Sequence, residues 1–151
     1  MSTTLSDTLN RYVIAGCAEA IYCIGDDFGI VCNPQFAILP SHPYRSPLIV
    51  AVYCTAGRAT GRINARTFDI VEGGFLIVLP NQITELIDTT PDFKATYVIM
   101  SEKFTANLGI GNTFDIASIV AERPYIRLEG RAREALDGYI KMCTSLIPIE
   151  E

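Results

Sequence analysis

The sequence predicts one compact, mainly β domain with C-terminal helices, an α+β fold built on an antiparallel sandwich or barrel. Its 151 residues are the usual length of a single domain with one core. Hydrophobic residues make up 49% and charged residues 19%, a composition that forms a core and argues against disorder. Between residues 28 and 100, short β-rich runs alternate with turn residues.

Residues 1–26 are expected to form a helical and then extended segment. Apolar residues recur there at helical spacing, namely Leu5, Leu9, Tyr12, Val13 and Cys17. Residues 2–4 include serine and threonine, which cap helices well, so the helix is expected to begin near them.

Residues 27–101 are expected to form the β-barrel. The β-rich runs lie at residues 29–33, 36–40, 48–54, 59–64, 67–71, 75–80, 83–88 and 95–100. Proline, glycine and asparagine separate them, as turns require. Seven or eight short strands with short links are typical of antiparallel sandwiches and barrels. Because no glycine-rich phosphate loop joins a strand to a helix, a doubly wound nucleotide fold is not predicted.

Residues 102–151 are expected to be helical, with the strongest helix at residues 129–147. Apolar residues recur there at intervals of three and four, which predicts an amphipathic helix. The pattern alone favours a helix packed on its own barrel. A second interpretation is a helix that also pairs with its twin in a homodimer, through Leu136, Tyr139, Ile140, Cys143 and Ile147.

Charge and cysteine content exclude several functions. The net charge of −5 and the pI near 4.9 argue against nucleic-acid binding by this chain, which usually needs a basic face. The five cysteines form no C-x-x-C pair and are interpreted as small buried hydrophobes. With one histidine, His42, the chain is not expected to hold a metal. The longest apolar run, residues 48–54, is too short to cross a membrane. Without a secretory signal, the expected location is the cytoplasm.

Four sequence features occur in an order that points to a family. They are "HPYR" at residues 42–45, "G-x-x-x-G-x-I-N" at 57–64, "GG-x5-P" at 73–80 and "DFKATYVIMSEKF" at 92–104. From about residue 27 to 147 the chain resembles the cupin, or small jelly-roll, sensory domain of AraC-type bacterial transcription regulators. The resemblance implies a ligand-binding barrel, a small-molecule effector, and a helix after the barrel that supplies the dimer contact. It also implies DNA binding only through a C-terminal pair of helix-turn-helix units, which residues 1–151 do not contain.

Metal-binding cupin enzymes provide a test of this resemblance. Their first motif places two histidines where this chain has Ile63 and Ala65. Their second motif places a histidine five residues after the proline, where this chain has Glu85, and a glycine where it has Gln82. The shell of a cupin is therefore expected without a metal or another cofactor.

Glu85 is the most unusual candidate for ligand binding. Alternation along residues 83–88 places Glu85 on one face with Ile83 and Ile87. If these isoleucines face the barrel interior, Glu85 does too, and an inward carboxylate requires a partner. That partner is a polar ligand in one interpretation and Arg62 in another. A local inversion that leaves Leu86 inside is the third.

The other candidate ligand contacts each have a structural alternative. His42 and Arg45 lie in a proline-rich loop. In one interpretation they gate the barrel mouth, and in the other they are ordinary exposed polar residues of the loop. Tyr53 and Tyr97 offer hydroxyls to a pocket, or are core tyrosines whose hydroxyls bond to backbone partners. Arg62 occupies a position compatible with a pocket, whereas its neighbour at position 64 is expected in a hairpin turn.

Three functional hypotheses follow. The first is a non-enzymatic, effector-sensing and dimerisation domain of an AraC-type regulator. The alternative is a metal-free cupin enzyme, an isomerase or lyase using Glu85, His42 or Tyr53, although acid–base catalysis needs a matched pair that the sequence does not show. The third is a dimerisation module whose barrel is filled by its own side chains.

Overall fold

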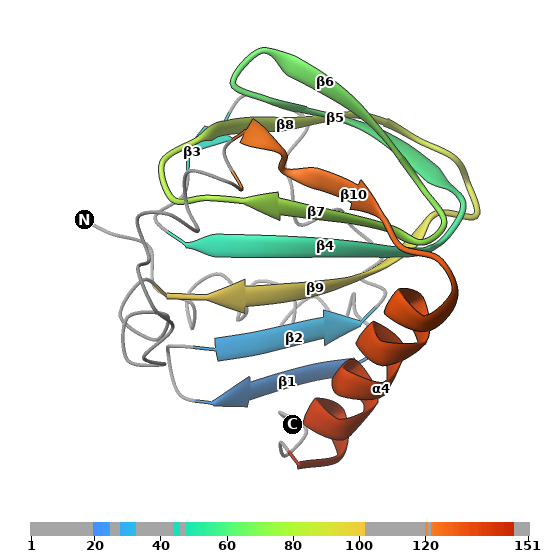
Figure 1. The fold of residues 1–151 in the computed structure, drawn as a ribbon. Helices are drawn as coiled ribbons and strands as arrows, with labels where there is room; N and C mark the ends of the chain where they lie inside the picture. The colour runs from blue at the N-terminus through green and yellow to red at the C-terminus, as the bar shows by residue number, and fades with distance from the viewer. Residues whose placement is uncertain are drawn as a thin grey trace.

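The computed structural model describes residues 20–24, 28–32, 44–45, 48–101, 120 and 122–146. The strands and the helix α4 of this part of the chain are drawn in Figure 1. The large sheet holds β1 (Ala20–Ile24), β2 (Phe28–Cys32), β4 (Ile49–Ala56), β7 (Gly74–Val78), β9 (Lys94–Met100) and β10 (Tyr125–Arg127). The small sheet holds β3 (Tyr44–Arg45), β5 (Arg58–Ile63), β6 (Arg66–Val71) and β8 (Ile83–Thr89), and the helix is α4 (Gly130–Leu146).

The strand order is that of a jelly roll. The large sheet runs β1-β2-β9-β4-β7-β10 and the small sheet β3-β8-β5-β6, and all pairs are antiparallel. From β2 to β9 the chain passes repeatedly between the two sheets, which gives two four-stranded sets, β2-β9-β4-β7 and β3-β8-β5-β6. The predicted fold class is confirmed: a mainly β, cupin-like pair of antiparallel sheets with a C-terminal helix.

The core lies between the two sheets. On β4, Val50, Val52 and Cys54 alternate inward, and on β9 Tyr97 points inward between Ala95 and Ile99, the face predicted for it. The small sheet contributes buried side chains from the opposite side, namely Ala59, Ile63 and Ile70. Phe68, Leu86, Phe93 and Tyr125 pack around this cluster.

Two turns explain why the chain reverses where it does. Asn64 and Ala65 have φ angles of 46° and 71°, the left-handed pair that a two-residue hairpin turn between β5 and β6 requires. The expectation that Asn64 belongs to this turn is confirmed. Gly57 has a φ of 71°, and a Cβ atom there would lie 2.6 Å from the Phe93 backbone, so glycine alone fits.

Seven of the predicted β-rich runs coincide with observed strands, and the eighth, residues 36–40, lies outside the described residues. The predicted N-terminal helix also lies outside them, and the end of that segment forms β1. The two-residue strand β3 replaces part of the expected loop, because Tyr44 and Arg45 pair with Thr84 and Ile83 at the start of β8.

Helix α4 coincides with the strongest predicted helix and runs beside the large sheet, across the ends of its strands (Figure 1). Leu136, Ile140 and Cys143 are half-buried, whereas Tyr139 and Met142 are 63% and 51% exposed. In the described part of the chain, no helix has the length and apolar character needed to cross a membrane.

Candidate functional site

The side chain of Glu85 faces outward, so the expectation that it lies in the barrel interior is wrong. On β8 the inward positions are Thr84, which is 4% exposed, and Leu86, which packs against the core. Ile83 and Ile87 are 42% and 45% exposed. The strand is therefore inverted relative to the hydrophobic pattern, as the local-inversion interpretation anticipated.

Arg62 and Glu85 form an ion pair across β5 and β8. Arg62 Nη1 lies 2.8 Å from Glu85 Oε1, and the two residues are direct partners in the strand register. The Arg62 side chain is 45% exposed, which places the pair on the outer surface of the small sheet. This geometry matches the structural pairing considered for Glu85, while a ligand-binding role for either residue stays a prediction.

Tyr53 is buried on the outer face of the large sheet, under α4. Because Val52 and Cys54 point into the core, alternation along β4 directs Tyr53 to the opposite face, where it is 2% exposed. Its hydroxyl donates a 2.6 Å hydrogen bond to Asp137 Oδ1 and accepts one of 3.3 Å from Arg133 Nε. Tyr53 is therefore buried, as the core-tyrosine interpretation expected, but its partners are side chains of the helix and not the backbone partner expected there.

The contacts of Tyr53 extend to the turn between β6 and β7. Arg133 Nη2 lies 3.0 Å from Glu72 Oε1 in that turn. We call Tyr53, Glu72, Arg133 and Asp137 the Tyr53 cluster. Next to it, Gly73 accepts a 2.8 Å hydrogen bond from the Leu128 amide just before α4. A Cβ atom at Gly73 would lie 2.8 Å from the Leu128 carbonyl oxygen, so glycine permits this close approach.

The environment of this region raises the pKa of the Tyr53 phenol and of the Cys54 thiol. Burial, followed by the hydrogen bond to Asp137, raises the pKa of Tyr53 above its ordinary 10.0. Hydrogen bonds to Tyr53 and then Glu72 raise the pKa of Arg133. Burial also raises the pKa of the neighbouring Cys54 thiol, which donates to the Ala56 carbonyl oxygen at 3.3 Å. At neutral pH the cluster therefore holds α4 in place, and neither the Tyr53 phenol nor the Cys54 thiol is ionised.

The side of α4 that carries Arg133 faces the sheet, and a different side is apolar and exposed. Ala132, Ala135, Tyr139 and Met142 follow each other at spacings of three and four and are all exposed. We call these four residues the outer stripe of α4. Of the residues predicted for a dimer contact, Tyr139 belongs to this stripe, and Ile147 lies outside the described residues.

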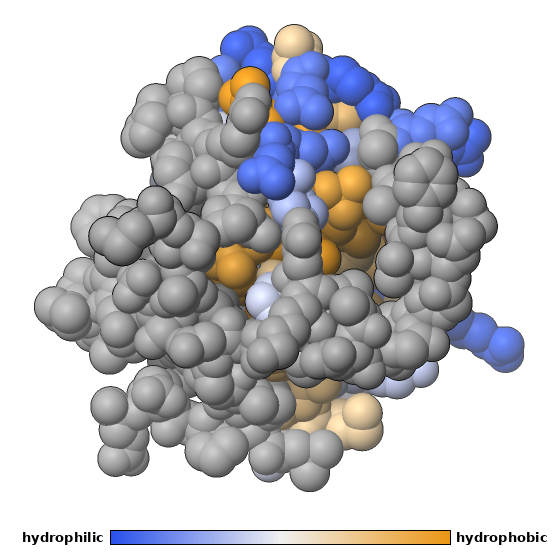
Figure 2. Space-filling model, turned by 90° about the vertical axis from the view of Figure 1, so that its left-hand side faces the viewer, coloured by the Kyte–Doolittle hydropathy of each residue, from blue (hydrophilic) through white to orange (hydrophobic). Residues whose placement is uncertain are grey.

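Apolar side chains of the interior lie at the end of the barrel opposite α4. Residues 79–82 link β7 to β8 there, so the end of β7 and the start of β8 lie at the same end of the barrel. Figure 2 looks onto this end and shows apolar residues below the hydrophilic surface of the small sheet. The buried residues at this end are Leu48, Val50, Ile63, Val78 and Thr84.

The remaining predicted site residues divide into two groups. Tyr97 is in the core between the sheets. His42 lies outside the described residues, as does the side chain of Arg45. Among the described residues, no three histidine, cysteine, aspartate or glutamate side chains gather as a metal site would require.

The chain matches no protein-family model and no curated protein sequence. Among solved structures it is similar to the cupin domain of Cnp3 from Schizosaccharomyces pombe, at 17% identity and a TM-score of 0.45, covering 63% of this chain and 72% of that one. It is also similar to a putative mannose-6-phosphate isomerase from Ralstonia eutropha, at 14% identity and a TM-score of 0.43, covering 54% and 81%. The match to oxalate decarboxylase from Bacillus subtilis, at 13% identity and a TM-score of 0.40, covers 87% of this chain and 38% of that one. These likenesses concern the cupin fold and carry no information on activity.

Sequence reasoning missed the Tyr53 cluster. Tyr53 is a candidate for a pocket in the sequence, but its partners lie 80 and 84 positions away along the chain. Asp137 and Arg133 are polar residues in an amphipathic helix, where such residues usually face water. Their spacing of four on the helix was the available signal, since residues four apart share a face.

Proposed function

We propose that this domain senses a small molecule and passes the signal through α4, as the sensory half of an AraC-type transcription regulator. The observation that carries the proposal is the Tyr53 cluster. It connects a central core strand to a helix whose outer stripe is apolar and exposed. No catalysis is assigned to this domain.

The strand β4 is the physical link in this mechanism. Val52 and Cys54 face the interior, and Tyr53 between them contacts α4 on the other face. A shift of β4 therefore changes the position of the Tyr53 hydroxyl, to which Asp137 is bound. A ligand drives such a change only if it binds one arrangement more tightly than the other.

The end of the barrel opposite α4 is where the effector is proposed to enter. Apolar interior residues lie there, and the proline-rich segment with His42 and Arg45 precedes the strand that begins at this end. Ligand sites are usually concave and apolar with a few polar groups. Arg62 and Glu85 are assigned a structural role in this proposal, since they pair with each other on the outer surface.

The outer stripe of α4 is the proposed dimer contact. Exposed apolar residues at spacings of three and four pack against a second helix in the manner of a coiled coil. Ala132 and Ala135 permit close approach of the two helices, and Tyr139 and Met142 supply apolar area. The exposed charged residues of α4 outside the stripe, such as Glu134 and Lys141, remain in water.

The dimer is tested by analytical ultracentrifugation of the wild-type chain and of Tyr139→Glu. We expect a reversible dimer in the wild type and a dissociation constant raised at least about 100-fold by the buried charge. Lys141→Glu, a change of two charge units at another exposed position of the same helix, is the control and is expected to stay within about threefold. A wild-type chain that remains monomeric at high concentration refutes this part of the proposal.

Sensing is tested by thermal-shift screening of sugars, organic acids and lipid-like compounds. A true effector raises the melting temperature and also changes the dimer dissociation constant. In Tyr53→Phe the effector still binds, but its influence on the dimer is reduced because the link to Asp137 is lost. An effector whose influence is unchanged in this variant contradicts transmission through the Tyr53 cluster. Reading the source gene beyond the codon for Glu151 tests the attached helix-turn-helix segment.

The packed interior favours a second candidate, a dimerisation module that binds no effector. The inward side chains of the described strands already form one buried cluster. Dimerisation without any hit in the ligand screen would favour this module over a sensor. The metal-free enzyme has less support. Tyr53 and Glu85 lie on the outer faces of different sheets and so do not form an acid–base pair.

A further inference from the structure

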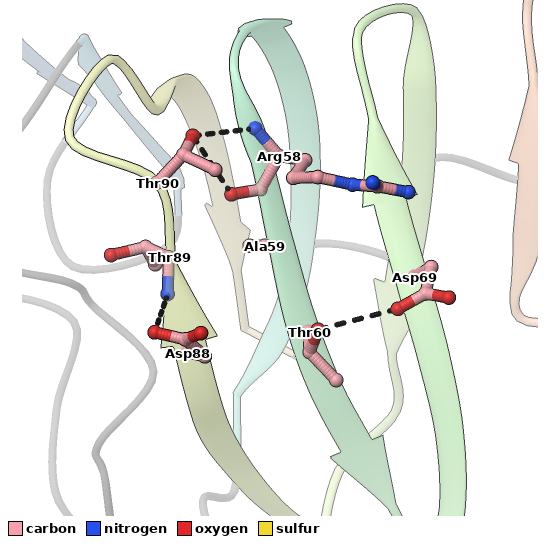
Figure 3. A pocket seen from close by; sticks show the side chains of 7 residues that line it. All are labelled: Arg58, Ala59, Thr60, Asp69, Asp88, Thr89 and Thr90. Carbon is pink, nitrogen blue, oxygen red and sulfur yellow. Dashed lines mark hydrogen bonds between the residues drawn. The ribbon is translucent and has the colours of Figure 1, made fainter.

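The outer surface of the small sheet carries a groove of about 220 Å³ that spans β6, β5 and β8 (Figure 3). Its lining comes from Arg58, Ala59, Thr60, Asp69, Asp88, Thr89 and Thr90, and we call it the outer-sheet groove. Thr60, Asp69 and Asp88 are register partners on the outer face of the small sheet, which is opposite the face that carries the buried residues Ala59 and Ile70.

Strand register determines how the charges are arranged in the groove. Thr60 on β5 is paired with Asp69 on β6 and with Asp88 on β8. The two aspartates therefore flank Thr60, on strands that are about 9–10 Å apart. Arg58 precedes Thr60 by two residues and lies on the same face. Figure 3 shows its guanidinium extended over β6, on the opposite side of β5 from Asp88.

A β-bulge places Asp88 in this arrangement. Gly61 pairs with Leu86, while Thr60 pairs with Asp88, so Ile87 has no direct partner on β5. In a regular ladder Ile87 would be opposite Thr60. The bulge thus brings a carboxylate to the position next to Thr60, in keeping with the general role of bulges in redirecting side chains.

The charges of the groove are not neutralised by each other. The Arg58 guanidinium makes no ion pair with any described residue, whereas Arg62 on the same face is paired with Glu85 at 2.8 Å. Asp69 Oδ1 accepts a 3.2 Å hydrogen bond from the Thr60 hydroxyl, and Asp88 Oδ1 accepts a 2.9 Å bond from the Thr89 amide. Within the described structure, the second oxygen of each carboxylate has no hydrogen-bond donor.

We infer that the outer-sheet groove binds a small amino-carboxylate with one carboxylate and two cationic amines, the charge pattern of a basic amino acid. The carboxylate pairs with Arg58, and the amines pair with Asp69 and Asp88. Such a ligand neutralises all three charges, while a ligand of one sign leaves part of them unpaired and meets a like charge. An uncharged sugar would pair none of them, and the groove lining contains no aromatic ring for a sugar to stack on.

The test is an NMR titration of the ¹⁵N-labelled full chain with L-lysine. We expect saturable shifts of the amide signals of Arg58, Thr60, Asp69 and Asp88. Three comparison compounds each lack a feature of the ligand. 6-Aminohexanoate lacks one amine, 1,5-diaminopentane lacks the carboxylate, and glucose lacks the carboxylate and both amines. Each is expected to bind at least about tenfold more weakly, because a charge-assisted hydrogen bond is lost.

Two surface variants identify the residues involved. Asp88→Asn and Arg58→Gln are each expected to raise the dissociation constant of L-lysine about tenfold or more, with the spectrum of a folded chain retained. Arg131→Gln removes an exposed arginine from α4, away from the groove, and is expected to leave the constant unchanged.

Several results would overturn the inference. One is the absence of saturable shifts at millimolar L-lysine. Another is binding of 1,5-diaminopentane as tightly as L-lysine, which would identify a merely acidic surface. Binding by glucose, or shifts confined to residues of the barrel interior, would also refute it. None of these outcomes depends on the dimer or on the effector of the barrel.

Discussion

Removing the hydroxyl of Tyr53 is the most direct perturbation of the contact between the barrel and α4. Tyr53→Phe keeps the ring in its buried place and deletes the donor to Asp137 and the acceptor for Arg133. Arg133 keeps its ion pair with Glu72 at 3.0 Å. The variant therefore tests one pair of hydrogen bonds, without opening a cavity at the site of the ring.

The size of the effect follows from the burial of the partners. A hydrogen bond to a charged group contributes about 1.5–3 kcal/mol to stability. Asp137 is exposed, so water replaces its lost donor, and the lower part of that range applies. We expect Tyr53→Phe to lower the free energy of unfolding by about 1.5 kcal/mol. This corresponds to a melting temperature lower by about 3–6 °C for a domain of this size.

Urea unfolding gives the global effect, and native-state hydrogen exchange locates it. We expect the amides of α4 to exchange faster in Tyr53→Phe than those of β4 and β9, since the lost bonds hold the helix. Tyr139→Phe is the matched control. That residue lies on the same helix but is 63% exposed, and its change is expected to stay within about 0.5 kcal/mol.

The pH dependence of the difference provides an independent check. The pKa of Tyr53 is raised above 10.0 in the folded state, so its contribution is complete below pH 10 and is lost as pH rises through the folded value. The advantage of the wild type over Tyr53→Phe should therefore shrink above pH 10. Equal stability of the two proteins at neutral pH, with unchanged exchange in α4, would refute this account of the Tyr53 cluster.

Three further predictions concern single side chains. Because burial raises the pKa of the Cys54 thiol, iodoacetamide near neutral pH should label Cys54 much more slowly than the half-buried Cys143. Peptide mass spectrometry measures both labelling rates. Equal rates would contradict the buried position of Cys54. Glu85→Gln breaks a partly exposed ion pair and should lower the unfolding free energy in urea by no more than about 1 kcal/mol, whereas a loss above about 2 kcal/mol would indicate a buried charge. Gly73→Ala should cost at least about 1–2 kcal/mol, because its φ is 88° and the new Cβ would meet the Leu128 carbonyl. In the same urea assay Gly138→Ala, with open space around it in α4, should add about 1 kcal/mol, and the reverse order would count against the described backbone.

The fold was predictable because its signals are local. The glycine, proline and asparagine residues that end each strand act within the turn itself, as Asn64 and Ala65 show with their positive φ angles. Alternation along β4 and β9 gave the buried face of each strand, including Tyr97. The short strand β3 was missed because two residues contain no period, and its pairing with β8 depends on partners about 40 positions away.

The orientation of β8 could not be predicted from its own residues. Ile83 and Ile87 are two apolar side chains on one face against Leu86 alone on the other, yet the register with β5 places Thr84 opposite Ile63 and Leu86 opposite Gly61, all facing the core. Tertiary pairing thus overrides the hydrophobic pattern, and the bulge at Ile87 interrupts the alternation on which the prediction depended.

Helix α4 illustrates how far a periodic pattern determines function. The spacing of apolar residues predicted the helix and a wide apolar surface, but half of that surface is turned toward the sheet and half toward solvent. The division between the halves is set by Arg133 and Asp137, because their bonds to Tyr53 fix the rotation of the helix about its axis. If those bonds break, the same residues remain helical, but Tyr139 and Met142 no longer have a fixed direction. A polar cluster under an apolar helix therefore helps to determine which residues α4 presents to solvent.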